Sequence, residues 1–140
     1  MSPTTRAGGF ALTAGIVELT LTTAAIHASL GGLLFTLNAA GYVALAMAVT
    51  AAATIPHPLV RRFSWLPRVA LAAYTSATIG GYVVMGPYFV LGWVTKAIEV
   101  AIVTLVVADL IRVHGSPSGL WWAIGDAFGR RGPADSAARS

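Results

Sequence analysis

Three ionisable residues lie within long apolar stretches of the sequence and are the first candidates for chemistry. Lys96 and Glu99 are three residues apart in one stretch, and Glu18 lies in another. Residues three apart share one face of a helix, so the lysine and the glutamate can pair. Glu18 reaches the same site if the two helices are neighbours. Two carboxylates and one ammonium then carry an excess negative charge, which favours a held proton or a bound cation.

Three roles remain open for these charges, because ionisable groups inside a bilayer are costly and rarely incidental. In the first, Lys96 and Glu99 are a neutral structural pair, and Glu18 is protonated or faces a water-filled crevice. In the second, the three residues couple a proton or an ion to transport. In the third, they dock a charged helix of a partner protein.

Further polar residues are expected to hold helices together rather than to react. Asp109 and Arg112, again three residues apart, predict an ion pair at the end of the last apolar stretch. Buried amides and hydroxyls usually bridge helices in membranes, and the candidates for this role are Asn38, Tyr42, Tyr74 and Thr75. If a cavity exists, we expect its lining to include the hydroxyls of the third stretch and the charges of the fourth.

The three histidines do not form a recognisable metal-binding pattern. His27, His57 and His114 are far apart in the sequence, and the chain has no cysteine. We therefore expect solvated loop histidines, with no metal and no cofactor. Nucleophile elbows, zinc-protease motifs and nucleotide-binding glycine loops are also missing. The sequence accordingly predicts a protein that is not an enzyme.

The composition explains why these few polar residues stand out. Of 140 residues, 56% are hydrophobic and only 10% are charged, with a mean hydropathy of +0.76. Soluble domains carry about 25% charged residues, so these values exclude a soluble enzyme, a disordered tail and a nucleic-acid-binding domain. The basic pI of about 10.1 reflects few, dispersed arginines, and no nucleic-acid partner is expected. An all-α polytopic membrane protein is predicted.

A membrane-spanning helix needs about 20 mostly apolar residues, and four stretches meet or approach this length. We expect spans at about residues 8–28, 33–54, 68–85 and 90–112, which form an antiparallel four-helix domain over residues 1–112. Residues 113–140 are expected to form a tail with a short amphipathic helix at about 120–129. Trp121, Trp122 and Phe128 would anchor that helix at the membrane surface.

The distribution of arginine predicts the orientation of the spans. The terminal and central segments hold Arg6, Arg61, Arg62, Arg68, Arg112, Arg130, Arg131 and Arg139, whereas the connections at 29–32 and 86–89 hold no lysine or arginine. Both termini are therefore expected in the cytoplasm. Eight arginines to one lysine indicate a GC-rich bacterial genome, and hence the bacterial cytoplasmic membrane. Cleavage of a signal peptide after Ala28 is the alternative for the first span.

Residues 32–42, 73–75 and 95–100 resemble small four-span bacterial membrane proteins of uncharacterised function. The resemblance covers the second to fourth spans and implies that Lys96 and Glu99 belong to a shared pattern; it implies no activity. Small multidrug resistance transporters also have four helices and a glutamate in the first. They lack a lysine in the fourth helix, and the aromatic surroundings of their glutamate are absent around Glu18.

Two functions from different classes follow from these observations. The first is an accessory or scaffolding membrane subunit, favoured by the absence of catalytic motifs, the short loops and the aromatic tail. The second is a small proton- or cation-coupled transporter that uses Glu18, Lys96 and Glu99. In both cases the expected partners are the lipid bilayer and either a second copy of the chain or another membrane protein.

Overall fold

The computed structural model describes residues 3–128, and every element in this range is a helix. In chain order the elements are α1 (Pro3–Leu30), α2 (Leu33–Thr54), α3 (Pro58–Arg62), α4 (Leu66–Met85), α5 (Val90–His114) and α6 (Pro117–Ala127). No strand occurs within the described residues. The all-α class predicted from the sequence is therefore confirmed.

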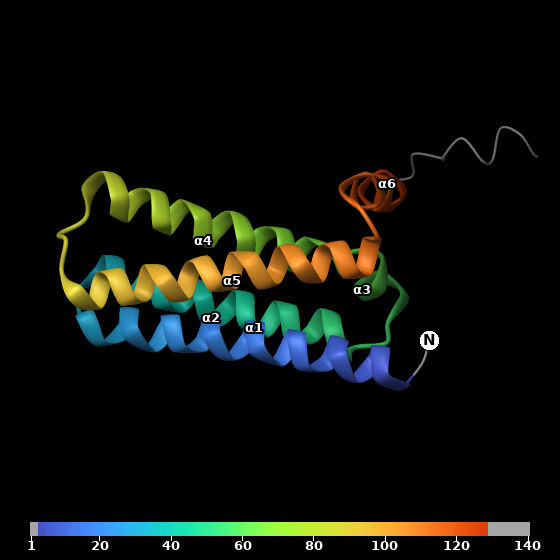
Figure 1. Ribbon diagram of the computed structural model, residues 1–140, viewed down its shortest axis with the longest axis horizontal. Coiled ribbons are helices and arrows are strands. Elements are labelled where there is room, and N and C mark those ends of the chain that lie inside the picture. Colours follow the sequence, from blue (N-terminus) through green and yellow to red (C-terminus); the bar gives the residue numbers. More distant parts are fainter. Residues whose placement is uncertain (1–2, 129–140) are drawn as a thin grey trace, which may run out of the picture.

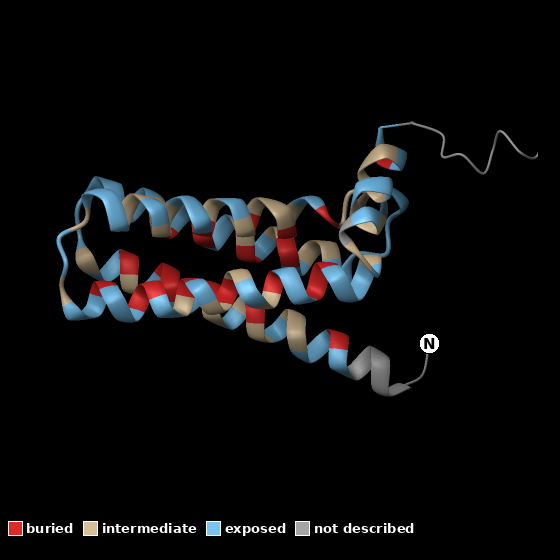
Figure 2. Cartoon of the chain, turned by 45° about the horizontal axis from the view of Figure 1, so that its top comes forward, coloured by how far each residue is buried: buried red, intermediate tan, exposed pale blue. Residues whose placement is uncertain are grey.

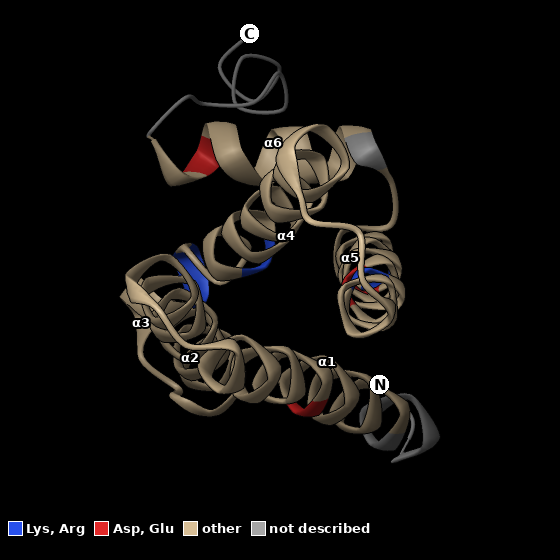
Figure 3. Cartoon of the chain, turned by 90° about the vertical axis from the view of Figure 1, so that its left-hand side faces the viewer, with Lys and Arg blue, Asp and Glu red and all other residues tan. Residues whose placement is uncertain are grey.

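The four long helices α1, α2, α4 and α5 lie side by side around a common centre (Figures 1 and 3). The α1–α2 and α4–α5 connections lie at one end, which we call the glycine end after Gly31, Gly32 and Gly86. The start of α1, helix α3 and helix α6 lie at the opposite end (Figure 1). We call this the arginine end, after Arg61, Arg62, Arg68 and Arg112.

Local sequence explains where the helices begin and end. Gly31 and Gly32 have φ values of 71° and 83°, a left-handed conformation that glycine adopts without strain, and they separate α1 from α2. Gly115, with φ 75°, ends α5 in the same way. Ser116 then caps α6 by accepting a hydrogen bond from the Gly119 backbone N–H at 3.0 Å.

Three of the helices are long and apolar enough to cross a membrane: Gly8–Leu30 within α1, Leu33–Thr54 (α2) and Val90–His114 (α5). This finding agrees with the membrane class predicted from the sequence. Helix α4 has 20 residues but is not among the three, and it carries Arg68 and a run of hydroxyl-bearing residues in its sequence. Four spans are therefore not established by length and composition.

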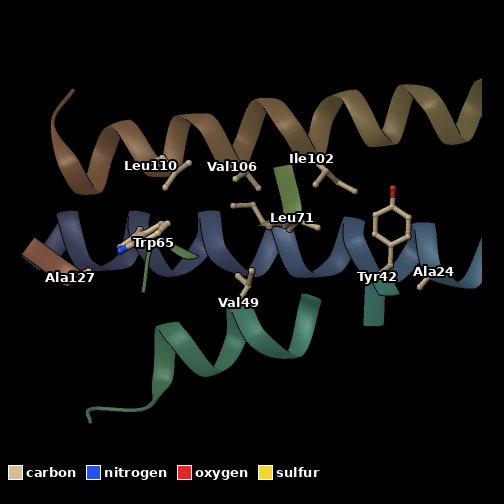
Figure 4. Close-up of a cluster of buried hydrophobic side chains, with 10 residues drawn as sticks. Ala24, Tyr42, Val49, Trp65, Leu71, Ile102, Val106, Leu110 and Ala127 are labelled. Carbon is tan, nitrogen blue, oxygen red and sulfur yellow. The ribbon is translucent and has the colours of Figure 1, made fainter. Parts of the chain in front are cut away.

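The buried residues are concentrated around the centre of the bundle. Buried residues lie on the inward faces of the long helices, and the outward faces are largely exposed (Figure 2). Large apolar side chains dominate the exposed set, as at Val90 (81% exposed) and Val84 (78%). A soluble monomer rarely shows so much contiguous apolar surface, whereas a bilayer covers it. Figure 4 shows the buried cluster running along the bundle, from Ala24 and Tyr42 to Trp65 and Ala127.

The predicted amphipathic helix at 120–129 overlaps α6, which runs across the bundle at the arginine end (Figure 1). Trp121, Trp122 and Phe128 are 56–70% exposed, and Ala127 is buried in the core cluster. The short helix α3 was not predicted; His57 Nδ1 caps it by accepting from the Leu59 backbone N–H at 3.3 Å. The side chain of Arg6 and the part of the predicted tail beyond Phe128 lie outside the described residues.

Candidate functional site

Lys96 and Glu99 form an ion pair inside the bundle, one turn apart on α5. Lys96 Nζ donates a hydrogen bond to Glu99 Oε2. Glu99 is fully buried, and Lys96 is 7% exposed. Glu99 lies nine residues after Val90, or about 14 Å along the helix at 1.5 Å per residue. The pair is therefore well inside the span, where an unpaired charge would be costly.

The other oxygen of the Glu99 carboxylate is bound from α2. The Tyr42 hydroxyl donates to Glu99 Oε1 at 3.0 Å, and Tyr42 is fully buried. The same hydroxyl lies 2.8 Å from Thr78 Oγ1 on α4. Lys96 Nζ also donates to the Thr78 main-chain carbonyl at 3.4 Å. Helices α2, α4 and α5 thus meet at one polar network.

Helix α1 adds a histidine to this network. His27 Nε2 is 3.8 Å from Glu99 Oε1, and His27 is only 4% exposed. Its Nδ1 lies 2.8 Å from the Thr23 carbonyl, which can only accept, so Nδ1 carries a hydrogen. In the neutral ring, Nε2 then directs a lone pair at the carboxylate. The expectation of a solvated histidine is wrong for His27.

The position of His27 follows from the periodicity of α1. Residues Thr20, Thr23 and His27 are spaced by three and four, so they form one stripe, and all three are buried. This spacing is the sequence signal that could have placed His27 in the bundle. We call His27, Tyr42, Thr78, Lys96 and Glu99 the Glu99 network.

Glu18 does not join the Glu99 network, although α1 and α5 are neighbours. Its side chain is exposed. Glu18 is two residues from both Ile16 and Thr20, which are fully buried. Two residues correspond to about 200° of rotation in an α-helix, so Glu18 lies on the outward face of α1. Of the three charged residues predicted to meet, only Lys96 and Glu99 do so.

The polar residues expected between helices lie close to the Glu99 network. The Tyr74 hydroxyl on α4 donates to Asn38 Oδ1 on α2 at 2.6 Å. The Tyr74 ring meets the Tyr42 ring edge-to-face, with 5.1 Å between centroids. Thr75 is fully buried, and its hydroxyl has no hydrogen-bond partner within the described residues.

A cavity of about 410 Å³ opens beside the Glu99 network at the glycine end. Apolar side chains make up most of its wall. Its polar lining consists of His27, Asn38, Tyr74, Thr78, Tyr82, Thr95 and Lys96. Glu99 is not a lining residue, but Lys96 and His27, which contact its carboxylate, both line the cavity.

Tyr82 on α4 forms one wall of this cavity and packs closely on α5. Lys96 Nζ lies 5.3 Å from the centre of the Tyr82 ring, a cation–π distance. Gly92 permits this approach, because a Cβ atom there would lie 2.7 Å from Tyr82 Cζ. The ring therefore covers one side of the Lys96 ammonium.

A second charged cluster lies at the arginine end of α5. Arg112 Nη2 and Nε donate to Asp109 Oδ1 at 2.6 and 3.1 Å. Arg68 on α4, which we did not predict as a partner, donates from Nε to Asp109 Oδ2 at 2.6 Å. Asp109 is fully buried, and Arg68 is 7% exposed. Two guanidinium groups thus share one carboxylate.

An apolar layer separates the two charged clusters. Glu99 and Asp109 are ten residues apart on α5, or about 15 Å along the helix. Between them lie fully buried apolar side chains from all four long helices: Ile16, Val49, Leu71, Ile102 and Val106. We call this set the apolar plug. The plug places apolar side chains between the Glu99 network and the Asp109 cluster.

Within residues 3–128, no three side chains of histidine, aspartate or glutamate are grouped to hold a metal ion. His27 and Glu99 approach each other, but Lys96 occupies the other side of the carboxylate. In comparisons with known proteins, no family model, no curated protein and no solved structure matches the chain.

Proposed function

We propose that this chain is a small proton-coupled transporter in which Glu99 is the proton site. The observation that carries the proposal is the cavity beside the Glu99 network. Lys96 and His27 line it, and both contact Glu99. An ion pair that only stabilises a bundle needs no access to solvent, and apolar packing would serve as well.

The geometry supports a proton step at Glu99. When the carboxylate is ionised, it pairs with the Lys96 ammonium and accepts from Tyr42. When it takes up a proton, the pair is broken and the ammonium is left with the Thr78 carbonyl and the cavity. His27 can deliver that proton once its Nε2 has taken one up from the cavity, because Nε2 faces Oε1 across 3.8 Å, a gap that a small rotation closes. Protonation thereby changes the charge that the cavity presents.

The proposal includes a topology. The four long helices span the bilayer as an antiparallel bundle, with both termini on the arginine side, which is the cytoplasm of a bacterium. The cavity then faces outward, and the apolar plug closes the inner path. Transport requires the plug to open, and the relative movement of helices in a bundle is the usual means of alternating access.

The competing proposal is the accessory or scaffolding subunit. In that case, the Glu99 network only stabilises the bundle, and α6 with its exposed tryptophans is a docking element. Loss of the network would then lower protein abundance and partner binding. No flux would depend on Glu99.

Reconstitution into liposomes tests the transport proposal. A pH-sensitive dye inside the vesicles reports proton entry driven by a potassium diffusion potential. We expect flux with the wild-type protein, loss of flux with Glu99→Gln, and unchanged flux with Glu18→Gln. The Glu18→Gln variant is a matched control because it makes the same chemical change on the outward face of α1.

A double variant separates transport from stability. In Lys96→Met/Glu99→Gln both charges are removed, so no buried charge is left unpaired. If the Glu99 network is only structural, the double variant should regain protein abundance and partner binding together with stability. The transport proposal predicts a stable protein without flux. Wild-type vesicles that are no more permeable to protons than empty ones would refute the proposal.

A further inference from the structure

A second cavity, of about 730 Å³, lies at the arginine end and has a basic lining. It is formed by the beginnings of α1 and α4, the ends of α2 and α5, and the α3 region. Three arginines line it: Arg61, Arg68 and Arg112. Among the described residues, no aspartate or glutamate lines the cavity. The cavity is distinct from the Glu99 network and plays no part in the proposed proton step.

The charge balance of the wall leaves this cavity positive. Arg68 and Arg112 are both paired with Asp109, so one carboxylate compensates two guanidinium groups. Arg61 adds a third positive charge and has no ion-pair partner within the described residues. Arg68 also uses Nη1 to donate to the Ser64 carbonyl at 2.7 Å. Each guanidinium has five N–H donors, so donors remain for a ligand.

The Arg112 side chain packs directly against the backbone of α1. Gly9 on α1 lies against the Arg112 guanidinium, and a Cβ atom at Gly9 would be 2.8 Å from Arg112 Nη1. Thr13 and Thr50 also line the cavity, and their hydroxyls donate to the Gly9 and Ala46 main-chain carbonyls at 3.1 and 2.8 Å. The guanidinium groups are thus the donors available to a ligand, and their planar fork matches the geometry of a phosphate group.

The remaining wall of the cavity is apolar and continues along the helices. Phe10 and Val17 on α1 line it, and Phe10 is 76% exposed. The cavity therefore joins a cationic pocket at the ends of the long helices to an apolar groove along them. A phospholipid has the same division, with a phosphate at the bilayer surface and acyl chains below it.

We propose that the arginine-end cavity binds a phosphate-bearing anion through Arg61, Arg68 and Arg112. The phosphate can come from the headgroup of an acidic phospholipid or from free phosphate, and the two sources present the same chemistry to the guanidinium groups. Arg68 and Arg112 are held in place by Asp109 before the ligand arrives, which lowers the cost of ordering them.

Native mass spectrometry of the full-length protein, released from detergent, tests this site. The protein is titrated separately with phosphatidylglycerol and with phosphatidylcholine of the same acyl chains. Inorganic phosphate is titrated by calorimetry. Arg61→Gln is the test variant, because Arg61 is exposed and outside the Asp109 cluster. Arg62→Gln is its matched control: Arg62 is the next residue of α3, but it does not line the cavity.

We expect one tightly bound phosphatidylglycerol per chain, with roughly tenfold weaker binding in Arg61→Gln, as for loss of one charge-assisted contact, and little change in Arg62→Gln. Phosphate binding with the same dependence on Arg61 would identify free phosphate as a source. Failure of both phosphate and phosphatidylglycerol to bind would overturn the proposal. Equal binding of the two lipids, or equal weakening by both variants, would also overturn it.

Discussion

Replacement of Lys96 by methionine is the sharpest perturbation of the Glu99 network. The methionine keeps the apolar stem but removes the ammonium that compensates Glu99, which is fully buried. Tyr42 then remains as the one hydrogen-bond donor to the carboxylate among the described residues. Leaving one partner of a buried ion pair uncompensated costs about 3–5 kcal/mol. We expect the free energy of unfolding to fall by this amount.

Glu99→Gln and the double variant Lys96→Met/Glu99→Gln provide a second check on the predicted loss of unfolding free energy. Glu99→Gln leaves the Lys96 ammonium, which lines the cavity and keeps the Thr78 carbonyl as an acceptor, so we expect a smaller loss of about 1–3 kcal/mol. The double variant removes both charges and keeps an acceptor for Tyr42, so its loss should be about 1 kcal/mol. The double variant is therefore expected to be more stable than Lys96→Met alone.

Reversible unfolding in mixed micelles with increasing sodium dodecyl sulfate, followed by circular dichroism, measures the three changes under one condition. A double-mutant cycle then gives the coupling energy between the two residues. If the two single losses simply add in the double variant, Lys96 and Glu99 are not coupled. That result would refute the description of the network as one unit.

Three further predictions concern other parts of the bundle. Asp109→Asn should lower the free energy of unfolding by about 2–4 kcal/mol, since two guanidinium groups lose their shared counter-charge; Asp126→Asn, on an exposed residue of α6, should change it by less than about 0.5 kcal/mol. Gly92→Ala should lower the free energy of unfolding by about 1–3 kcal/mol, because the added methyl group forces the Tyr82 ring outward. Gly80→Ala should raise it by up to about 1 kcal/mol, because the space around Gly80 is open. If α6 lies at the bilayer surface, Trp121→Phe should reduce the fraction of tryptophan fluorescence that brominated phospholipids quench; an unchanged fraction would place that ring away from lipid.

Local features of the fold could be predicted because they depend on neighbouring residues. The stretch predicted at 33–54 coincides with α2, since glycines with positive φ precede it and Pro56 follows it. Lys96 and Glu99 face one another because both lie on one turn of one helix. The same holds for Asp109 and Arg112.

Contacts between helices could not be predicted, because they depend on how each helix is rotated. In a soluble bundle, hydrophobic periodicity fixes this rotation. Here the outward faces are as apolar as the inward ones, so the pattern does not distinguish them. Glu18 was therefore expected inside, although it lies outside, and Arg68 was treated as a topology signal, although it binds Asp109. The buried face of α1 is marked by the polar stripe of Thr20, Thr23 and His27. The single charged residue in the same apolar stretch, Glu18, does not mark it, because its side chain is exposed.

The distribution of charges over the two halves of the chain makes one half electrostatically independent of the other. Helices α4 and α5 form a hairpin, and this hairpin contains both partners of every carboxylate–lysine and carboxylate–arginine pair found in the described residues. The hairpin of α1 and α2 contributes only uncharged or titratable partners, Tyr42 and His27. The second hairpin therefore carries the counter-charges of its own acidic groups, independently of the first hairpin. Packing of the first hairpin against it adds the Tyr42 hydrogen bond and the His27 contact to Glu99.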